Sequence, residues 1–257
     1  MKGKTQIYIG TSGWHYNHWV ELFYPPEITG YKELTFHSQH FNSVENNSSF
    51  YRIASENTYK TWYKMTPPEY KFSMRLNKII THINRLELNG EVKEKVRFIL
   101  SSTQVLKEKM GAMVIQLPPS FKYDVKKLEI FLAFITREIS QYDYKFDIAI
   151  EFRNKYWFTD EIYTLLEKYN IALVAGQSSR YPDIRHVTAN SAYIRMHGPE
   201  KLFSSTYTRE QLIELAQYIK KNSKSVKKVY VYFNNDFHGF ALENAKDLSK
   251  IIFKLTH

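Results

Sequence analysis

The sequence predicts an α/β fold, a single (β/α)8 barrel of the TIM type. Eight short β-rich runs alternate with helical patterns along 257 residues, and about 250 residues is the usual length of such a barrel. Some runs, such as Val229-Tyr230-Val231-Tyr232-Phe233, are apolar almost throughout, as in a parallel sheet buried on both faces. No linker, repeat or change of composition divides the chain, so we expect one domain over residues 1–257. A doubly wound open sheet is the alternative.

The expected strands are short runs rich in β-branched and aromatic residues. They lie at residues 6–10, 43–47, 71–76, 112–117, 146–152, 171–175, 192–197 and 228–234. Apolar residues at helical spacing predict the helices between and after them. These lie at residues 31–41, 56–65, 92–110, 124–139, 159–169, 208–221 and 239–253. Asp124 and Thr208 are N-cap signals, and residues 176–190 lack a helical pattern.

Composition excludes several classes of protein. With 43% hydrophobic residues the chain can fill a core, which excludes a disordered protein, and the absence of cysteine excludes thiolate catalysis and thiolate metal sites. No apolar run approaches the ~18 residues of a membrane span. The first residues do not resemble a signal peptide, so we expect a cytoplasmic protein with no membrane partner.

The formal charge of +10 arises from 36 basic and 26 acidic residues. Of the basic residues 26 are lysines, and most lie on the predicted helices, which is typical of a solvated exterior. Only 10 are arginines, and three of them, Arg75, Arg153 and Arg195, fall at or just beyond strand ends.

Polar side chains gather at the carboxyl ends of the expected strands. Because strand side chains alternate between two faces, Glu151 and Arg153 share the interior face with Ala149, as Arg195 shares it with Tyr193. An unpaired buried ion costs several kcal/mol, roughly, so these residues predict a polar site. Barrels of this type carry their chemistry at this end.

We expect this site to bind a small anionic ligand, because arginine suits planar recognition of phosphate or carboxylate. The expected binding residues are Arg75, Arg153, Arg195, Asn47, Gln116, Asn234, Trp14 and His82. The expected catalytic residues are Glu45, Glu151 and His197, with a glutamate as general base. Whether the chain is an enzyme is left open; an enzyme would hydrolyse an anionic substrate. No metal ligand and no cofactor is assigned.

Three alternatives compete with this interpretation. The charges could pair with one another only to close the barrel. The net charge and the aromatic loops also suit a nucleic-acid-binding or nuclease-like barrel. A glycosidase-like barrel would use Glu45 and Glu151 as its carboxylate pair, with Trp14 and Trp157 as platforms for sugars.

Several segments along the chain together form a known sequence pattern. They are Gly10-Thr11-Ser12-Gly13-Trp14, Phe41-Asn42-Ser43-Val44-Glu45-Asn46-Asn47-Ser48-Ser49-Phe50-Tyr51, Gln116-Leu117-Pro118-Pro119-Ser120-Phe121, Ala149-Ile150-Glu151-Phe152-Arg153, Tyr193-Ile194-Arg195-Met196-His197-Gly198 and Tyr232-Phe233-Asn234-Asn235-Asp236. On these segments the chain resembles the YecE-like family, the "domain of unknown function 72". It implies a TIM-type barrel and supplies no reaction.

The chain departs from the pattern of this family at three places. The family's usual His after Glu-Phe-Arg is Asn154, its frequent Asp at the end of strand six is missing from Val174-Ala175-Gly176-Gln177-Ser178, and its usual Lys in strand three is Arg75. A mechanism that needs an acid or base at the first two places is therefore not expected in this protein.

Overall fold

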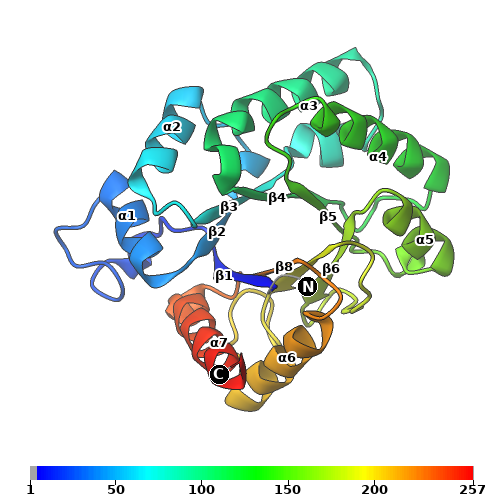
Figure 1. Ribbon diagram of the computed structural model, residues 1–257. Helices are drawn as coiled ribbons and strands as arrows, with labels where there is room; N and C mark the ends of the chain where they lie inside the picture. The colour runs from blue at the N-terminus through cyan, green and yellow to red at the C-terminus, as the bar shows by residue number, and fades with distance from the viewer. Residues whose placement is uncertain (1–4, 257) are drawn as a thin grey trace.

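Eight parallel strands close into a barrel surrounded by helices in the computed structural model, which describes residues 5–256 (Figure 1). The strands are paired in chain order, and β1 pairs with both β2 and β8. This closure confirms the predicted fold class and excludes the open sheet. Residues 1–4 and 257 of the predicted domain lie outside the described residues.

The eight predicted strands are confirmed, each to within two residues at either end. Their bounds are β1 (Gln6–Ser12), β2 (Ser43–Asn46), β3 (Lys71–Arg75), β4 (Met110–Gln116), β5 (Asp147–Glu151), β6 (Ala172–Gln177), β7 (Ser191–Met196) and β8 (Lys228–Phe233). The first strand runs two residues past its predicted end at Gly10, so Thr11 and Ser12 also belong to the sheet. This extension brings Ser12 into register with Glu45.

Seven α-helices of the described chain lie outside the barrel. They are α1 (Tyr31–His40), α2 (Glu56–Met65), α3 (Gly90–Thr103), α4 (Val125–Ser140), α5 (Asp160–Lys168), α6 (Arg209–Asn222) and α7 (Phe240–Thr256). Asp124 and Thr208 cap α4 and α6 as predicted, and the segment from β6 to β7 is not helical. Among the described residues no helix combines the length and apolarity needed to cross a membrane.

The predicted helix over residues 92–110 is wrong over its last seven residues. Helix α3 ends at Thr103, and a 3-10 segment, η4 (Gln104–Lys109), follows it. Lys107 has a φ of 49°, a left-handed conformation that a right-handed helix cannot contain. The chain turns there and enters β4 at Met110.

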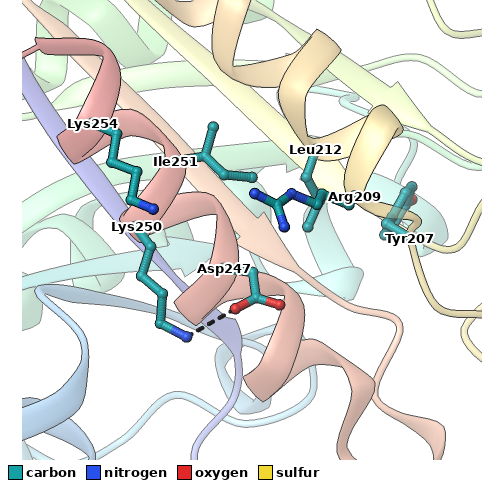
Figure 2. Close-up of a pocket in the computed structure, with 7 residues that line it drawn as sticks. All are labelled: Tyr207, Arg209, Leu212, Asp247, Lys250, Ile251 and Lys254. Carbon is teal, nitrogen blue, oxygen red and sulfur yellow. Dashed lines mark hydrogen bonds and ion pairs between the residues drawn. The ribbon is translucent and has the colours of Figure 1, made fainter.

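A groove of about 310 Å³ lies between α6 and α7 on the outer layer (Figure 2). It is lined by Tyr207, Arg209, Leu212, Asp247, Lys250, Ile251 and Lys254. Asp247 accepts a hydrogen bond from Lys250 across one turn of α7. None of these residues was predicted to belong to the functional site.

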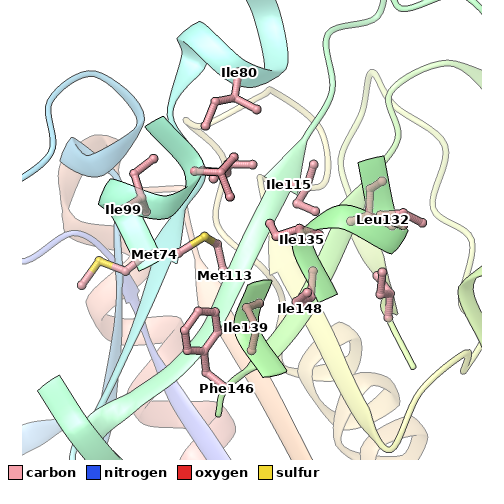
Figure 3. Close-up of a cluster of buried hydrophobic side chains, with 14 of the residues drawn as sticks. Met74, Ile80, Ile99, Met113, Ile115, Leu132, Ile135, Ile139, Phe146 and Ile148 are labelled. Atoms are coloured by element: carbon pink, nitrogen blue, oxygen red, sulfur yellow. The ribbon is translucent and has the colours of Figure 1, made fainter. Parts of the chain in front are cut away.

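Apolar side chains pack on both faces of the strands. On the outer face, side chains of β3, β4 and β5, such as Met113 and Ile148, pack under Leu132 and Ile135 of α4 (Figure 3). The inner face of the barrel is filled largely by alanine, valine and tyrosine: Tyr8, Ala112, Val114, Ala149, Ala172, Val174, Tyr193, Tyr230 and Tyr232. The period-2 alternation predicted from the sequence therefore holds, and it turns the strand-end residues that follow inward.

Candidate functional site

Charged side chains from several strands converge at the carboxyl end of the barrel, which we call the mouth. Glu45 lies on β2, Arg75 on β3, Glu151 on β5 and Arg195 on β7, each at or next to the end of its strand. Gln116, the last residue of β4, is in register with Glu151. Because all the strands are parallel and the sheet is closed, these ends meet across one opening.

Arg195 holds the two glutamates together at the base of the mouth. Its guanidinium donates through Nη2 to Glu45 Oε1 at 2.7 Å and through Nη1 to Glu151 Oε2. The Arg195 side chain is 1% exposed. Each of these buried carboxylates therefore has a charged partner, and so does the Arg195 guanidinium, as buried ions require.

Glu45 is saturated by donors. Oε1 also accepts from Ser12 Oγ at 2.8 Å, and Oε2 accepts from the Tyr193 hydroxyl at 2.7 Å. Burial raises the pKa of Glu45, but the charge and hydrogen bond of Arg195 outweigh burial and hold this pKa below its ordinary value. Such a carboxylate is a poor proton acceptor, which argues against its predicted role as general base.

Three guanidinium groups donate to a single neutral atom, Gln116 Oε1. Arg75 Nη2 lies 2.7 Å from it, Arg153 Nη2 lies 3.0 Å from it and Arg195 Nη1 lies 3.3 Å from it. Arg153 also donates through Nε to Glu151 Oε1 at 2.8 Å. The mouth therefore holds three guanidinium groups and two carboxylates, with one positive charge in excess.

Burial also raises the pKa of Glu151, but the charges of Arg195 and Arg153 outweigh burial, so the pKa lies well below the ordinary value. Both glutamates are thus ionised near neutral pH. A glycosidase needs one protonated carboxylic acid, and this pair does not supply it.

Arg75 lines the outer part of the mouth. Its Nη1 donates to Asn47 Oδ1 at 3.3 Å, and its guanidinium lies 4.1 Å from the centre of the Phe50 ring. Burial and the charge of Arg195 lower the pKa of Arg75 to about 10, which leaves it charged at neutral pH. Asn47 in turn donates to the Ser12 carbonyl at 3.1 Å.

His197 faces Glu151 from the end of β7. Asn234 Nδ2 donates to His197 Nδ1 at 3.2 Å, so the ring proton of the neutral imidazole lies on Nε2. That nitrogen is 3.7 Å from Glu151 Oε1. Burial lowers the pKa of His197, although the nearby Glu151 carboxylate opposes this effect. His197 is therefore a neutral donor aimed at the charged cluster.

Three buried N–H donors of the cluster have no hydrogen-bond acceptor among the described residues. They are Arg75 Nε, Arg195 Nε and His197 Nε2. Buried polar groups without a partner are uncommon in folded proteins, and they point to an unfilled interaction with solvent or a ligand.

His82 lies beside the cluster, on the short π-helix η3 (Ile79–Ile83). Its Nδ1 is 2.8 Å from Thr81 Oγ1, and its ring packs against the edge of Phe50. Burial, together with the charges of Arg75 and Arg153, lowers the pKa of His82 to about 4. This histidine is neutral at pH 7.

The two tryptophans predicted as sugar platforms do not face the mouth. Trp14 packs edge-on against Trp62 in the outer layer, with the two ring centres 4.9 Å apart. Trp157 is 1% exposed and stacks on Phe152 at 4.9 Å. The predicted binding role of Trp14 therefore finds no support in its position, and the glycosidase interpretation loses both platforms.

Ser12, Tyr193 and Tyr181 contact the cluster but were not predicted as site residues. The alternation along β7 already set Tyr193 on the inner face, and that signal could have identified it. Ser12 required the extension of β1 to be known. Tyr181, on the irregular segment after β6, has the Arg153 guanidinium 4.5 Å from its ring centre, a long-range contact that no local pattern indicates.

Among residues 5–256 no group of three or more His, Cys, Asp or Glu side chains is arranged to hold a metal ion.

Asn154, which replaces the family's usual histidine, accepts from the Tyr156 backbone and donates to the Pro119 carbonyl at 3.2 Å. It thus fixes the loop after β5.

Comparison with known proteins places this chain among uncharacterised relatives. It is 27% identical to the UPF0759 protein YunF of Bacillus subtilis over 96% of this chain and 94% of that protein. It is also 27% identical to the UPF0759 protein YecE of Escherichia coli, over 45% of this chain and 39% of that protein.

Solved structures agree with the barrel. A DUF72 family protein of Thermotoga maritima superposes with a TM-score of 0.84 at 26% identity, over 96% of this chain and 99% of that one. A D-psicose 3-epimerase superposes with a TM-score of 0.55 at 9% identity, which shows a shared fold alone. The family model described as "Protein of unknown function DUF72" matches residues 8–254, and the chain therefore belongs to that family.

Proposed function

We propose that the mouth binds a small anion, a phosphate or carboxylate group, at Arg75 and Arg153. The observation that carries this proposal is the convergence of three guanidinium groups on Gln116 Oε1 with only two carboxylates nearby. An excess buried positive charge is costly, and a bound anion compensates it.

The three arginines of the mouth differ in burial, and we assign them different roles accordingly. Arg195 is fully buried and neutralised by Glu45 and Glu151, so it supports the floor of the site. Arg153 is 13% exposed, and Arg75 is likewise only partly buried. These two share an acceptor and can turn their remaining N–H groups toward a ligand, as bidentate anion recognition requires.

Of the residues predicted as catalytic, His197 is the one whose N–H lacks an acceptor and can contact a bound anion. It is neutral, its tautomer is set by Asn234, and its Nε2 proton has no acceptor within hydrogen-bond distance. On a bound phosphate ester this nitrogen would donate a hydrogen bond to a phosphate oxygen. In the catalytic form of this proposal, hydrolysis of an anionic substrate, that hydrogen bond would stabilise negative charge on the phosphate oxygens.

Isothermal titration of inorganic phosphate tests the binding proposal. We expect Arg153→Gln and Arg75→Gln each to weaken phosphate binding about 10- to 100-fold, because each removes a charged donor. Arg85→Gln is the matched control, since Arg85 lies on the loop after β3 but bonds to Ser120. Its affinity for phosphate should equal that of the parent.

Acetate should be titrated in parallel, because a carboxylate offers the same two-oxygen edge as phosphate. The proposal is overturned if Arg75→Gln and Arg153→Gln bind phosphate and acetate as tightly as the parent does. It is also overturned if the folded parent binds neither anion.

A further inference from the structure

The loops around the mouth differ in charge between two halves of the barrel. We call the loops after β2, β3, β4 and β5, with residues 178–182 after β6, the basic half of the rim. These strands are consecutive neighbours in the barrel. Their loops carry seven basic residues: Arg52, Lys78, Arg85, Lys122, Arg153, Lys155 and Arg180.

Carboxylates are few on the basic half, and both are engaged. Glu87 pairs with Lys127 at 2.9 Å, and Asp124 caps α4 through the Lys127 backbone N–H. The loops after β7, β8 and β1 show the reverse balance, with one basic residue, Lys201, against Glu200, Asp236, Glu21 and Glu27. The lysine-rich helices of the outer layer do not produce this asymmetry, which lies in the loops themselves.

Exposed tyrosines stand on the basic half, each with a cation near its ring. Tyr51 is 65% exposed, and Lys78 Nζ lies 5.2 Å from its ring centre. Tyr156 is 66% exposed, and Lys155 Nζ lies 5.6 Å from its ring centre. A third tyrosine, Tyr181, is half-buried and has the guanidinium groups of Arg153 and Arg180 4.5 Å and 5.8 Å from its ring centre.

We propose that the basic half of the rim binds single-stranded nucleic acid, with one phosphate held in the mouth by Arg75 and Arg153. This inference rests on the anion site proposed above and names the substrate class of that site. Flat bases stack on exposed aromatic rings, and neighbouring cations neutralise the phosphates that link them. Paired bases in a duplex are already stacked, so they would gain nothing from Tyr51 and Tyr156.

Fluorescence anisotropy with a labelled oligothymidylate of about 12 nucleotides tests this inference, a length that a site of this kind spans. We expect Tyr51→Ala and Tyr156→Ala each to weaken binding about 5- to 100-fold. Tyr144→Ala is the matched control, because Tyr144 is 40% exposed but lies before β5, at the opposite end of the barrel. It should bind like the parent.

Added salt should weaken the binding progressively, with the slope of a contact to several phosphates. Equal affinity for the duplex of the same sequence, or no loss in the two tyrosine variants, would overturn the inference, since either result reports charge alone. If the oligonucleotide fails to bind at low salt while inorganic phosphate still binds at Arg75 and Arg153, the inference fails and the anion site stands. If phosphate also fails to bind, the proposed function fails with it.

Discussion

Replacing Arg195 with methionine is expected to lower the free energy of unfolding by about 3–5 kcal/mol, because it leaves two buried carboxylates without their shared partner. Glu45 would retain only the neutral donors Ser12 and Tyr193, and Glu151 would retain Arg153. Urea unfolding at pH 7 measures the loss as a fall in the transition midpoint.

Arg153→Met is the control for this prediction. The Arg153 side chain is partly exposed, and its removal leaves Glu151 paired with Arg195, so a smaller loss is expected. If Arg195→Met does not fold, a double variant that adds Glu45→Gln should recover folding, because Glu45 then carries no unpaired charge and Glu151 still pairs with Arg153. Unfolding of Arg195→Met within about 1 kcal/mol of the parent would contradict the account of the mouth.

Replacing Gly10 with alanine is expected to destabilise the barrel by about 3 kcal/mol or more, or to prevent folding. A Cβ at this position would lie 1.9 Å from the Ser43 carbonyl oxygen and 2.8 Å from its carbon. Those atoms belong to the backbone of β2, which is paired with β1 at this point, so they cannot move aside without separating the strands.

Gly176→Ala provides the matched control for this prediction. Gly176 also lies in a strand, β6, but an added Cβ there meets no atom within 4 Å. We expect its stability to be unchanged, or raised by up to about 1 kcal/mol, because alanine restricts the unfolded chain. Thermal unfolding of both variants and of the parent measures the difference in stability. A Gly10→Ala protein as stable as the parent would contradict the close approach of β1 and β2 at this point.

The inner and outer faces of the strands were predictable because side-chain alternation is a local property of the chain. The alternation set Glu151 and Arg153 inside with Ala149, and the structure confirms that placement. Helix starts were also predictable, because a cap depends on residues that are close in the sequence. Thr208 and Gln211, which form a reciprocal capping box at the start of α6, are an example. Strand order followed from the eight repeated units rather than from any single residue.

The pairing of the charges was not predictable, because it depends on barrel closure. Glu45 and Arg195 lie 150 residues apart on strands that are not neighbours, and only the closed ring brings them within 2.7 Å. The sequence likewise cannot separate a tryptophan of the rim from one of the core. Trp157 is buried because Phe152 and Phe121 cover it, and these contacts arise when the loop after β5 folds back.

The central claim is that the excess positive charge at the mouth is an anion site. Crystals soaked in tungstate, an electron-dense analogue of phosphate, test this claim most directly through anomalous scattering. We predict a peak at the mouth in contact with Arg75 and Arg153, and its loss in Arg153→Gln crystals. A peak at other basic surfaces, such as the groove beside Arg209 and Lys254, with none at the mouth would contradict the claim.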